Sequence, residues 1–246
     1  MRLFGLIGNP LDHSFSKQYF SEKFQREGIA GCTYELFPLA RIQELSHLLR
    51  DRPEMAGLNV TIPYKQQVMS YLAGHHIPGE IGACNCIRVI GGVCYGYNTD
   101  WIGFENSLLP LLTPRYQAAL VLGTGGASVA ITYVLRKLGI PFTQVGRELS
   151  ANASLTYSQL TASDIRAHQI IINTTPLGTF PDITTYPVLP YEALGAGHLL
   201  YDLVYNPSLT SFLKMGLQAG ARIKNGEEML RLQAEESWKI WNGKEH

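Results

Sequence analysis

The sequence predicts an α/β protein with two domains, and three observations support this prediction. Short apolar segments that suit strands alternate with helical segments along the first hundred residues. A buried strand, a glycine-rich turn and a helix follow one another at residues 118–138. The chain of 246 residues is long enough for two domains of medium size, each with its own core.

The composition excludes several classes of protein. Hydrophobic residues make up 46% of the chain, charged residues 16%, and the formal net charge is zero. Because no cluster of lysine or arginine is available to follow a phosphate backbone, we expect no nucleic-acid partner. The first apolar run, residues 3–7, is too short for the core of a signal peptide, and no apolar segment approaches the length that spans a membrane. We therefore expect a cytoplasmic protein without membrane contact.

The cysteines predict neither a metal site nor a disulfide framework. Cys32, Cys84, Cys86 and Cys94 lack the paired spacing of a zinc site, and a disulfide framework is unusual in a chain of this size. We expect reduced cysteines and no metal. The Cys84-x-Cys86 pair leaves open a redox or metal role, against the commoner role of small buried apolar residues.

In the first hundred residues, short apolar runs that end at glycine, proline or asparagine predict strands, and apolar residues at helical spacing predict helices. The expected strands cover residues 2–7, 32–37, 58–62, 81–90 and 93–97; the expected helices start near residue 17, cover residues 39–50 and run through residue 72.

Two hydroxyls stand just before the first helix. Ser14 and Ser16 are one residue apart, ahead of a helix that begins near Lys17. Either side chain can cap that helix, and for an isolated Ser-x-Ser capping is the commoner role.

The predicted strand at residues 58–62 has one polar face. Because strand side chains alternate, Asn59 and Thr61 share this face, while aliphatic residues occupy the other. Pro63 ends the strand where a helix can begin. Lys65 then stands in the first turn of this helix, where the helix dipole disfavours a cation and lowers its pKa. An idle, solvated lysine is the alternative.

Two more polar residues flank the next pair of strands, which Gly91-Gly92 joins. Asn85 and Asp100 lie at the edges of these strands, since the second strand runs into Asn98-Thr-Asp100. Each also has a purely structural interpretation, Asn85 as an Asx-turn residue and Asp100 as the N-cap of a helix that starts at Trp101.

The glycine turn predicts a site for an anion. Residues 118–122 suit a parallel strand that is covered on both faces, and residues 127–138 form a helix with one apolar face. Gly123, Gly125 and Gly126 let the backbone turn sharply and approach a ligand closely. The unpaired N–H groups of the helix then point at the ligand, typically a pyrophosphate.

The turn alone is a weak dinucleotide signal. The usual fingerprint has glycine where Ser128 stands. A plain glycine turn in an α/β domain is therefore the alternative.

Polar motifs recur in order along nearly the whole chain. They are Ser14-Phe-Ser16, Asn59-Val-Thr-Ile-Pro-Tyr-Lys65, Gly82-Ala-Cys-Asn85, Asn98-Thr-Asp100, Gly123-Thr-Gly-Gly-Ala127, Asn173-Thr-Thr-Pro-Leu-Gly178, Asp202-Leu-Val-Tyr-Asn-Pro207 and Gly226-Glu-Glu-Met-Leu-Arg-Leu-Gln233. In this order they resemble the motifs of the shikimate dehydrogenase family.

The resemblance implies an activity and a substrate site. The expected reaction is the reversible NADPH-dependent reduction of 3-dehydroshikimate to shikimate, on the route to chorismate and the aromatic amino acids. Lys65 and Asp100 are the implied acid/base pair. The implied ligands of the substrate are Ser14 and Ser16 for its carboxylate, Asn59, Thr61, Asn85, Asp100 and Gln233 for its ring hydroxyls, Lys65, and Tyr205 near the carboxylate.

The resemblance also implies a cofactor site, with NADP preferred to NAD. Its residues are Gly123, Thr124, Gly125, Gly126, Ala127, Arg147, Thr174, Thr175, Pro176, Leu203 and Gly226. Arg147 follows the second Rossmann strand, where an arginine accommodates the 2′-phosphate of NADP. Glu148 opposes it, and Ala151 stands where the family has a second cation.

The fold of the family implies a particular chain order. Residues 1–101 and 225–246 form an N-terminal α/β substrate domain with a mostly parallel sheet. Residues 102–224 form a Rossmann-type NADP-binding domain, and a C-terminal helix at residues 225–241 returns to the first domain. The small-molecule substrate is the expected partner, and the expected state is a monomer or homodimer.

The chain departs from the family pattern at several places. Lys17 replaces a frequent proline, Cys86 a threonine, Trp101 a glycine and Thr179 a methionine. The segment after Arg147 is short and polar, so we expect its crossover helix to be reduced to a loop with a short helix at residues 163–167.

Two alternative functions stay open. One is a relative that also accepts quinate and uses NAD. The other is a nucleotide sensor of the same fold without catalysis, and the presence of Lys65 and Asp100 argues against it.

Overall fold

The computed structural model describes residues 1–11 and 14–244, and the chain divides into two compact units. The first unit contains Met1–Thr99 and Gln233–His246, and the second contains Asp100–Leu232. The second boundary lies within the C-terminal helix α7 (Glu227–Trp241), so the first turns of this helix belong to the second unit. We had placed this boundary at residue 225.

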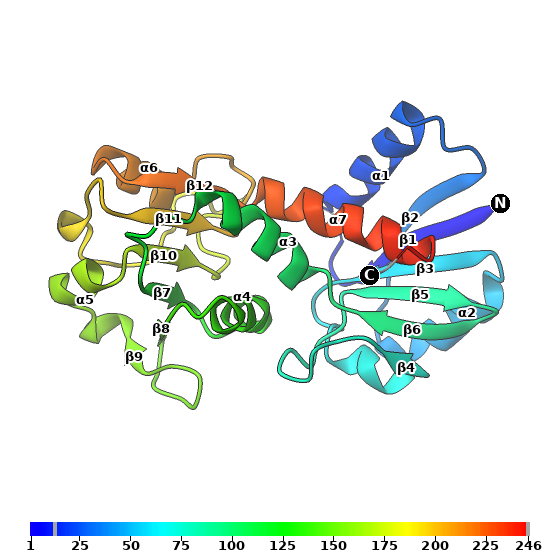
Figure 1. Cartoon of the computed structure of the whole chain (residues 1–246). Helices are drawn as coiled ribbons and strands as arrows, with labels where there is room; N and C mark the ends of the chain where they lie inside the picture. Colours follow the sequence, from blue (N-terminus) through cyan, green and yellow to red (C-terminus); the bar gives the residue numbers. More distant parts are fainter. Residues whose placement is uncertain (12–13, 245–246) are drawn as a thin grey trace. The chain divides into compact units, whose positions relative to one another are not determined.

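The first unit contains a mixed six-stranded sheet in the order β2-β1-β3-β5-β6-β4 (Figure 1). Strand β1 pairs in parallel with β2 and β3, and β4 with β6, whereas β5 is antiparallel to both of its neighbours. The strands are β1 (Arg2–Gly8), β2 (Cys32–Pro38), β3 (Met55–Val60), β4 (Gly74–His75), β5 (Cys86–Ile90) and β6 (Val93–Tyr97). The helical segments are α1 (Phe15–Arg26), η1 (Ile42–Glu44), α2 (Leu45–Asp51) and η2 (Gln67–Tyr71).

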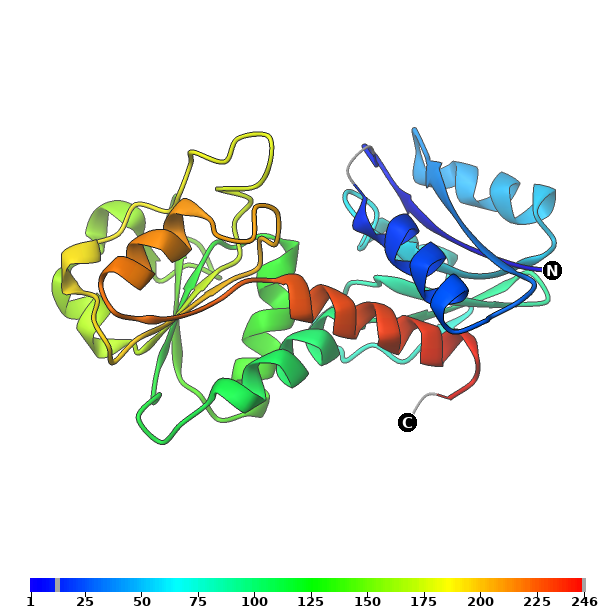
Figure 2. The same ribbon diagram turned by 90° about the horizontal axis from the view of Figure 1, so that it is seen from above.

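Aromatic packing holds α1 and the end of α7 against one face of this sheet, while α2 covers the other face (Figure 2). Phe20 of α1 stacks on Tyr34 of β2 with ring centroids 4.6 Å apart. Trp241 of α7 lies over Gly57, where an added Cβ would come within 2.3 Å of the indole. A side chain at Gly57 would therefore push α7 off the sheet.

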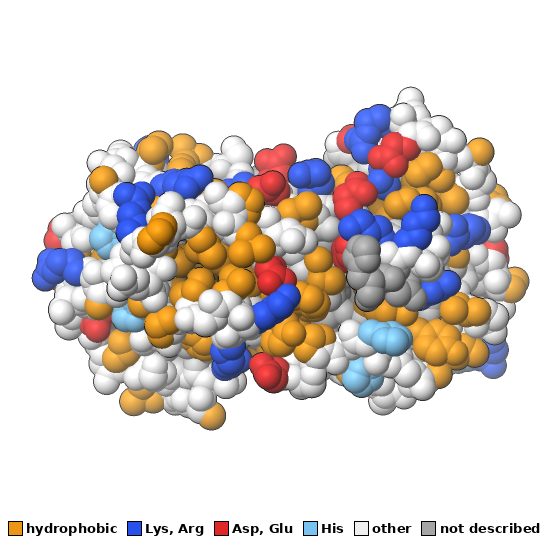
Figure 3. Space-filling view, in the orientation of Figure 1, with side chains coloured by type: hydrophobic (Ala, Val, Ile, Leu, Met, Phe, Trp, Pro, Cys, Tyr) orange, Lys and Arg blue, Asp and Glu red, His pale blue; other side chains and the backbone are white. Residues whose placement is uncertain are grey.

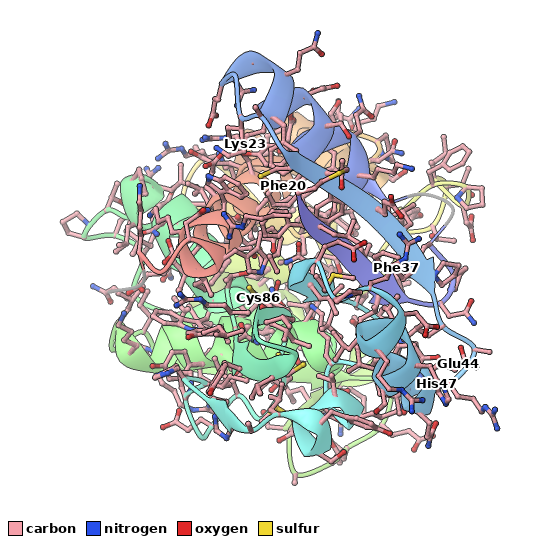
Figure 4. All side chains as sticks on the ribbon, turned by 90° about the vertical axis from the view of Figure 1, so that its right-hand side faces the viewer. Phe20, Lys23, Phe37, Glu44, His47 and Cys86 are labelled. Carbon is pink, nitrogen blue, oxygen red and sulfur yellow. The ribbon has the colours of Figure 1, made fainter. Side chains whose placement is uncertain are left out.

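An ion-pair network joins the same two helices. Lys23 of α1 is only 3% exposed and contacts Glu27 at 2.9 Å and Glu235 of α7 at 2.8 Å. Tyr19 donates a further hydrogen bond to Glu235. Figure 4 shows Phe20 and Lys23 on α1. The two residues anchor α1 by different means, one apolar and one ionic.

Two expected elements of the first unit differ in the structure. The helix expected at residues 39–50 begins only at Ile42, as a 3-10 turn followed by α2. Leu39 stays outside it, because its N–H donates to the Gly8 carbonyl of the neighbouring strand. The strand expected from residue 81 begins only at Cys86, because Gly82 has a φ of +56° and interrupts the extended backbone.

The second unit contains a parallel six-stranded sheet in the order β12-β11-β10-β7-β8-β9. This is the strand order of a Rossmann fold, as predicted. Its strands are β7 (Ala119–Leu122), β8 (Phe142–Gly146), β9 (Leu155–Thr156), β10 (Ile170–Asn173), β11 (Leu199–Asp202) and β12 (Arg222–Lys224). Its helical segments are α3 (Asp100–Leu108), η3 (Leu109–Leu111), α4 (Gly126–Lys137), η4 (Tyr157–Gln159), α5 (Ala162–Ala167), η5 (Tyr191–Ala193) and α6 (Ser211–Gln218), followed by the start of α7.

Helices cover both faces of this parallel sheet. Helices α3 and α4 pack on one face through Phe104, Ile131 and Leu135, which are fully buried. Helices α5 and α6 cover the other face through Ile165 and Phe212. The central strands β7, β10 and β11 are therefore buried throughout, which explains their uniformly apolar sequences.

The crossover after Arg147 is as short as predicted. Helix α5 has six residues, and the Thr161 and Asp164 side chains form a capping box at its start. A short strand, β9, precedes it and pairs with the end of β8. We had not predicted β9, because two residues carry no periodicity.

On the face shown in Figure 3, basic and acidic side chains are interspersed. No helix within the described ranges has the length and apolar character needed to cross a membrane.

Candidate functional site

A polar network in the first unit centres on Asn59, at the end of β3. Its Oδ1 accepts a hydrogen bond of 2.9 Å from the Tyr34 hydroxyl. Its Nδ2 donates to the backbone oxygen of Asn85 at 3.3 Å and to the Ser237 Oγ of α7 at 3.0 Å. Asn59 is only 5% exposed. The network therefore links β2, β3, the start of β5 and α7.

Thr99 extends the network toward Gln233. The Thr99 N–H donates to Asn85 Oδ1 at 2.6 Å, and Asn85 Nδ2 donates to Thr99 Oγ1 at 3.0 Å. Thr99 Oγ1 also lies 3.3 Å from Gln233 Oε1 and 3.3 Å from Ser237 Oγ. This geometry fixes the backbone directly before Asp100. The structure thus brings Asn59, Asn85 and Gln233 into one hydrogen-bonded network.

The two serines at the start of α1 have different partners. Ser14 is the N-cap, and its Oγ accepts from the Ser16 N–H at 3.3 Å. Burial raises the pKa of Tyr34, and the nearby Ser16 side chain acts in the opposite direction. Capping accounts for Ser14, and the free hydrogen of its hydroxyl can still be donated to a ligand.

The segment from Thr61 to Lys65 differs from the prediction. Strand β3 ends at Val60, and Thr61 begins a turn in which its carbonyl accepts from the Tyr64 N–H. The following helix is a 3-10 helix that begins at Gln67, so Lys65 precedes it. The prediction of an α-helix with Lys65 in its first turn was wrong, and a helix dipole has no bearing on Lys65. The backbone oxygen of Lys65 accepts from the Cys84 N–H at 2.7 Å, which holds this turn beside the Asn85 segment.

The cysteines of the first unit are free, and three of them are buried. Burial raises the pKa of Cys84 to about 12 and that of Cys94 to about 11, and it raises the pKa of Cys86 as well. Because the thiolate is the reactive form, these thiols are unreactive near neutral pH. They occupy the place of small buried residues, and the described ranges hold no group of three or more His, Cys, Asp and Glu that suits a metal.

In the second unit, the glycine turn connects β7 to α4 as predicted. Gly123 has a φ of +105°, and an added Cβ there would lie 2.8 Å from Thr174 Oγ1. Gly125 is the N-cap of α4 and supplies no capping side chain, and the first turn contains no acidic residue. An added Cβ at Gly125 or Gly126 would meet open space. The N-terminus of α4 therefore suits the pyrophosphate of a dinucleotide.

Hydrogen bonds of Ser128 and Gln144 stabilise this turn. Ser128, the departure from the usual glycine, is 1% exposed and donates to the Gly125 carbonyl at 2.7 Å. Gln144 Nε2 donates to Ser128 Oγ and to the Gly123 carbonyl, both at 2.9 Å. Sequence reasoning missed Gln144, because its partners lie on other elements.

The end of β8 carries the expected specificity residue. Arg147 is exposed and follows Gly146. An added Cβ at Gly146 would come within 2.8 Å of Ala153 and 2.9 Å of the Glu148 carbonyl. The family's asparagine therefore does not fit this tight loop without a shift. Arg147 lies close enough to Tyr157 to lower the pKa of its phenol, although burial raises that pKa to about 12.

The loop after β10 is held by Asn173. The Asn173 Oδ1 accepts from the Thr175 N–H at 3.0 Å and from the Thr175 hydroxyl at 2.6 Å. Thr174 Oγ1 donates to the Leu122 carbonyl at 2.7 Å, which ties the loop to the start of the glycine turn. Pro176 follows in the same loop. The expected cofactor residues of this loop and of the glycine turn therefore lie together at the carboxyl end of the sheet.

Asp202 holds the neighbouring segment. It is fully buried, and its carboxylate accepts from Asn173 Nδ2 at 2.9 Å, the Val204 N–H at 3.0 Å and the Thr210 hydroxyl at 2.6 Å. Burial raises its pKa to about 6, although all three hydrogen bonds act to lower it. The sequence motif pointed to this segment, but we assigned no role to Asp202 or Asn173.

The segment after Asp202 carries Leu203, Tyr205 and, across from it, Gly226. An added Cβ at Gly226 would lie 2.1 Å from the Leu203 carbonyl, so only glycine fits. The Gly226 N–H donates to the Val204 carbonyl at 3.1 Å. Tyr205 is partly buried, and burial raises the pKa of its phenol. Trp101, another departure, packs edge-on against Tyr133 in the same unit.

Comparison with known proteins identifies the family. Residues 6–87 match the model of the shikimate dehydrogenase substrate binding domain. A shikimate dehydrogenase (NADP(+)) of Clostridium beijerinckii is 37% identical, covering 98% of this chain and 92% of the relative, and that of Methanococcus maripaludis is 34% identical, covering 99% and 92%.

Solved structures agree with the sequence relatives. The shikimate 5-dehydrogenase of Thermus thermophilus in complex with NADP(H) and shikimate superposes with a TM-score of 0.85 at 27% identity, covering 99% of this chain and 94% of the other. A chorismate mutase/shikimate 5-dehydrogenase fusion protein of Clostridium acetobutylicum superposes with a TM-score of 0.86 at 32% identity, covering 99% and 92%. With relatives this similar along nearly its whole length, the chain belongs to the shikimate dehydrogenase family.

Proposed function

We propose that this chain is an NADP-dependent shikimate dehydrogenase that reversibly reduces 3-dehydroshikimate to shikimate. The observation that carries the proposal is the polar network of the first unit, which gathers Asn85 and Gln233 around Thr99. Amide and hydroxyl groups of this kind suit a small, polyhydroxylated ring. The second unit contributes a glycine turn and an uncapped helix start that suit a dinucleotide.

The substrate roles follow the family motifs. Ser14 and Ser16 bind the carboxylate, and Thr61, Asn85 and Gln233 bind ring hydroxyls. Tyr205 contributes to binding near the carboxylate. Asn85 and Gln233 belong to the polar network, which holds each of them in one orientation.

Lys65 and Asp100 perform the proton transfer. NADPH, when bound, supplies the hydride for the ketone, and the developing alkoxide then needs a proton. The Lys65 ammonium donates it, and Asp100 orients the ammonium and the substrate hydroxyl. Such proton transfer is commonly worth ~10² to 10⁴ in rate, or roughly 3 to 5 kcal/mol.

When bound, the cofactor would be held by residues at the carboxyl end of the parallel sheet. Gly123 to Ala127 would hold the pyrophosphate, Thr174 to Pro176 and Leu203 would line the dinucleotide, and Gly226 would let the backbone approach it. Arg147 would pair with the 2′-phosphate of NADP, since a guanidinium makes bidentate contacts with phosphate.

The proposed activity is tested by oxidation of shikimate, with NADP and with NAD. We expect turnover with NADP at a higher kcat/KM than with NAD, and lower activity on quinate. Absence of turnover with either cofactor, together with tight NADP binding, would favour a nucleotide sensor instead.

The first prediction concerns Lys65. Lys65→Ala lowers kcat by about 10² to 10⁴ with a much smaller change in substrate binding, because the proton is transferred in the transition state. Steady-state kinetics measure the split, and Lys214→Ala, an exposed lysine of α6, is the matched control. Near-native turnover of Lys65→Ala would refute the assignment.

The second prediction concerns Arg147. Arg147→Ala lowers kcat/KM with NADP and leaves kcat/KM with NAD nearly unchanged, because only NADP carries the 2′-phosphate. Arg166→Ala, in α5, controls for the loss of a positive charge. An NADP preference that survives Arg147→Ala would assign the selectivity to other residues.

We also propose that the protein works in the cytoplasm, where its free cysteines stay reduced. We propose a monomer or a homodimer, which sedimentation equilibrium distinguishes.

A further inference from the structure

Both hydrogen-bond donors of the Asn59 side chain have acceptors inside the protein. An amide nitrogen carries two hydrogens. In Asn59 one points to the Asn85 carbonyl and the other to Ser237 Oγ, while the amide oxygen accepts from Tyr34. The side chain is 5% exposed. A substrate hydroxyl could take an N–H of Asn59 only by breaking a buried hydrogen bond.

Tyr34 ties this amide to the packing of α1. Its hydroxyl is buried with the rest of the side chain, which is 3% exposed, and its hydrogen is donated to Asn59. Its ring stacks on that of Phe20 in α1, with centroids 4.6 Å apart. Tyr34 therefore links α1 to β3.

Ser237 ties the same amide to Gln233. These two residues are one turn apart on α7, and Ser237 Oγ donates to the Gln233 carbonyl at 3.0 Å. Ser237 Oγ also lies 3.3 Å from Thr99 Oγ1, which contacts the Gln233 amide oxygen. Ser237 is completely buried. Ser237 therefore connects Asn59 to the backbone of Gln233 and to Thr99, which contacts the side chain of Gln233.

We propose that Tyr34, Asn59 and Ser237 are positioning residues for shikimate. The resemblance implied that Asn59 is a ligand of the ring; here it is the centre of a frame that orients Asn85 and Gln233. This inference rests on the proposed function. Tyr34 and Ser237 carried no signal in the sequence, since a tyrosine in a strand and a serine in a helix are ordinary residues there.

The test compares Tyr34→Phe and Ser237→Ala with the wild type. Each removes a hydroxyl from the frame without removing a proposed ligand. We expect the KM for shikimate to rise roughly 5- to 30-fold, the scale of one buried unsatisfied partner, with the KM for NADP unchanged. Tyr64→Phe is the matched control, because it removes a buried tyrosine hydroxyl of the same unit that donates to the Leu39 carbonyl at 2.7 Å, outside the frame.

Two further measurements separate positioning from direct binding. In a double-mutant cycle, Tyr34→Phe should add little once Asn59 is already alanine, because its partner is gone. Analogues of shikimate that each lack one non-reacting ring hydroxyl should suffer the same fold increase in KM on Asn59→Ala. If Asn59→Ala raised the KM for shikimate but not the KM for one of the analogues, Asn59 would be a ligand of the hydroxyl that this analogue lacks. That result would overturn the inference.

The inference and the proposed function fail separately. A wild type that neither oxidises shikimate nor reduces 3-dehydroshikimate refutes the function. A wild type that is active, with Tyr34→Phe and Ser237→Ala folded and at the wild-type KM, refutes the inference alone. Melting temperatures of all variants establish folding, and a KM rise in Tyr64→Phe equal to that in Tyr34→Phe also counts against the frame.

Discussion

At the scale of single residues, Ser128 shows how a departure from a fingerprint is accommodated. A glycine is usual at its position because the helix packs close to the strand. Here the buried hydroxyl donates to the Gly125 carbonyl and accepts from Gln144. The serine is compatible with the turn because each of its hydrogen-bonding groups has a partner.

The third prediction concerns Gln144. Gln144→Leu raises the KM and the Kd for NADP roughly 3- to 10-fold, because Gly123 and Ser128 each lose a hydrogen bond that orders the turn. The kcat and the shikimate KM change little. Gln169→Leu, which removes a glutamine that accepts from the Gln117 N–H at the opposite end of the sheet, is the control. Equal effects of the two substitutions would show that Gln144 acts only on overall stability.

Asn59 illustrates a second lesson at this scale. Its place on the polar face of β3 and its place in a family motif both indicated a ligand. The hydrogen bonds of its amide indicate a buried junction. The residue type shows that a polar group stands at this position. Only its hydrogen-bond partners decide whether Asn59 binds a ligand or holds neighbouring residues in place.

At the scale of elements, the ends of β10 and β11 act together. Asn173 and Asp202 are paired in register as the last residues of these strands. Their side chains hold the loop that contains Thr175, the Val204 backbone and, through Thr210, the N-cap of α6. A buried carboxylate with neutral donors as its hydrogen-bond partners therefore organises three segments at once.

The fourth prediction is the pH dependence of stability that Asp202 causes. Its folded pKa of about 6 lies above the ordinary value of 3.8, so the folded state binds the proton more tightly than the unfolded state. The stabilisation that this proton provides is complete when the pH is below 3.8, and it is lost as the pH rises through about 6. The loss amounts to roughly 3 kcal/mol for a shift of about two units.

Asp202→Asn removes this titration while keeping an oxygen that can accept from Asn173 and Val204. The free energy of unfolding of the wild type, relative to Asp202→Asn, should therefore fall as the pH rises from about 4 through about 6 and then level off. Urea unfolding at several pH values measures it. A difference that is constant with pH would contradict the raised pKa.

At the scale of the whole molecule, each compact unit carries one set of proposed ligand contacts. Most of the proposed substrate contacts belong to the first unit, and the proposed cofactor contacts to the second. Each unit has its own sheet and its own buried core. Each ligand should therefore stabilise mainly the unit that binds it.

The fifth prediction follows from this division. NADP at 100 times its Kd stabilises the native state by roughly 2.7 kcal/mol, which raises the Tm by several degrees in a protein of this size. Arg147→Ala should reduce the shift caused by NADP and leave that caused by shikimate. Replacing Ser14 and Ser16 together by alanine should do the reverse. Scanning calorimetry resolves both shifts, and a variant that weakens both equally would show that the two sites are not separate.

Local sequence patterns predicted most of the fold. The strand, glycine turn and helix at residues 118–138 were predictable because the apolar periodicity and the glycines that break it are contained in one short stretch. The short helix α5 was predictable because the segment after Arg147 is short and polar, and the C-terminal helix from the chain order of the family. The predictions failed where a backbone is held by distant partners, as at Leu39, which bonds to Gly8, and at residues 65–72, where a 3-10 helix replaces an α-helix.

By itself, the sequence determined the two α/β units, the nucleotide turn and the family, since these depend on local periodicity and on motifs in chain order. Only the tertiary structure decided which polar residues are free to meet a ligand. Asn59 and Ser237 are 178 positions apart and yet share a hydrogen bond, and Asn85 and Thr99 face each other across 14 positions. A hydrogen bond depends on distance and direction in space, and no pattern of neighbouring residues records which donors are already used.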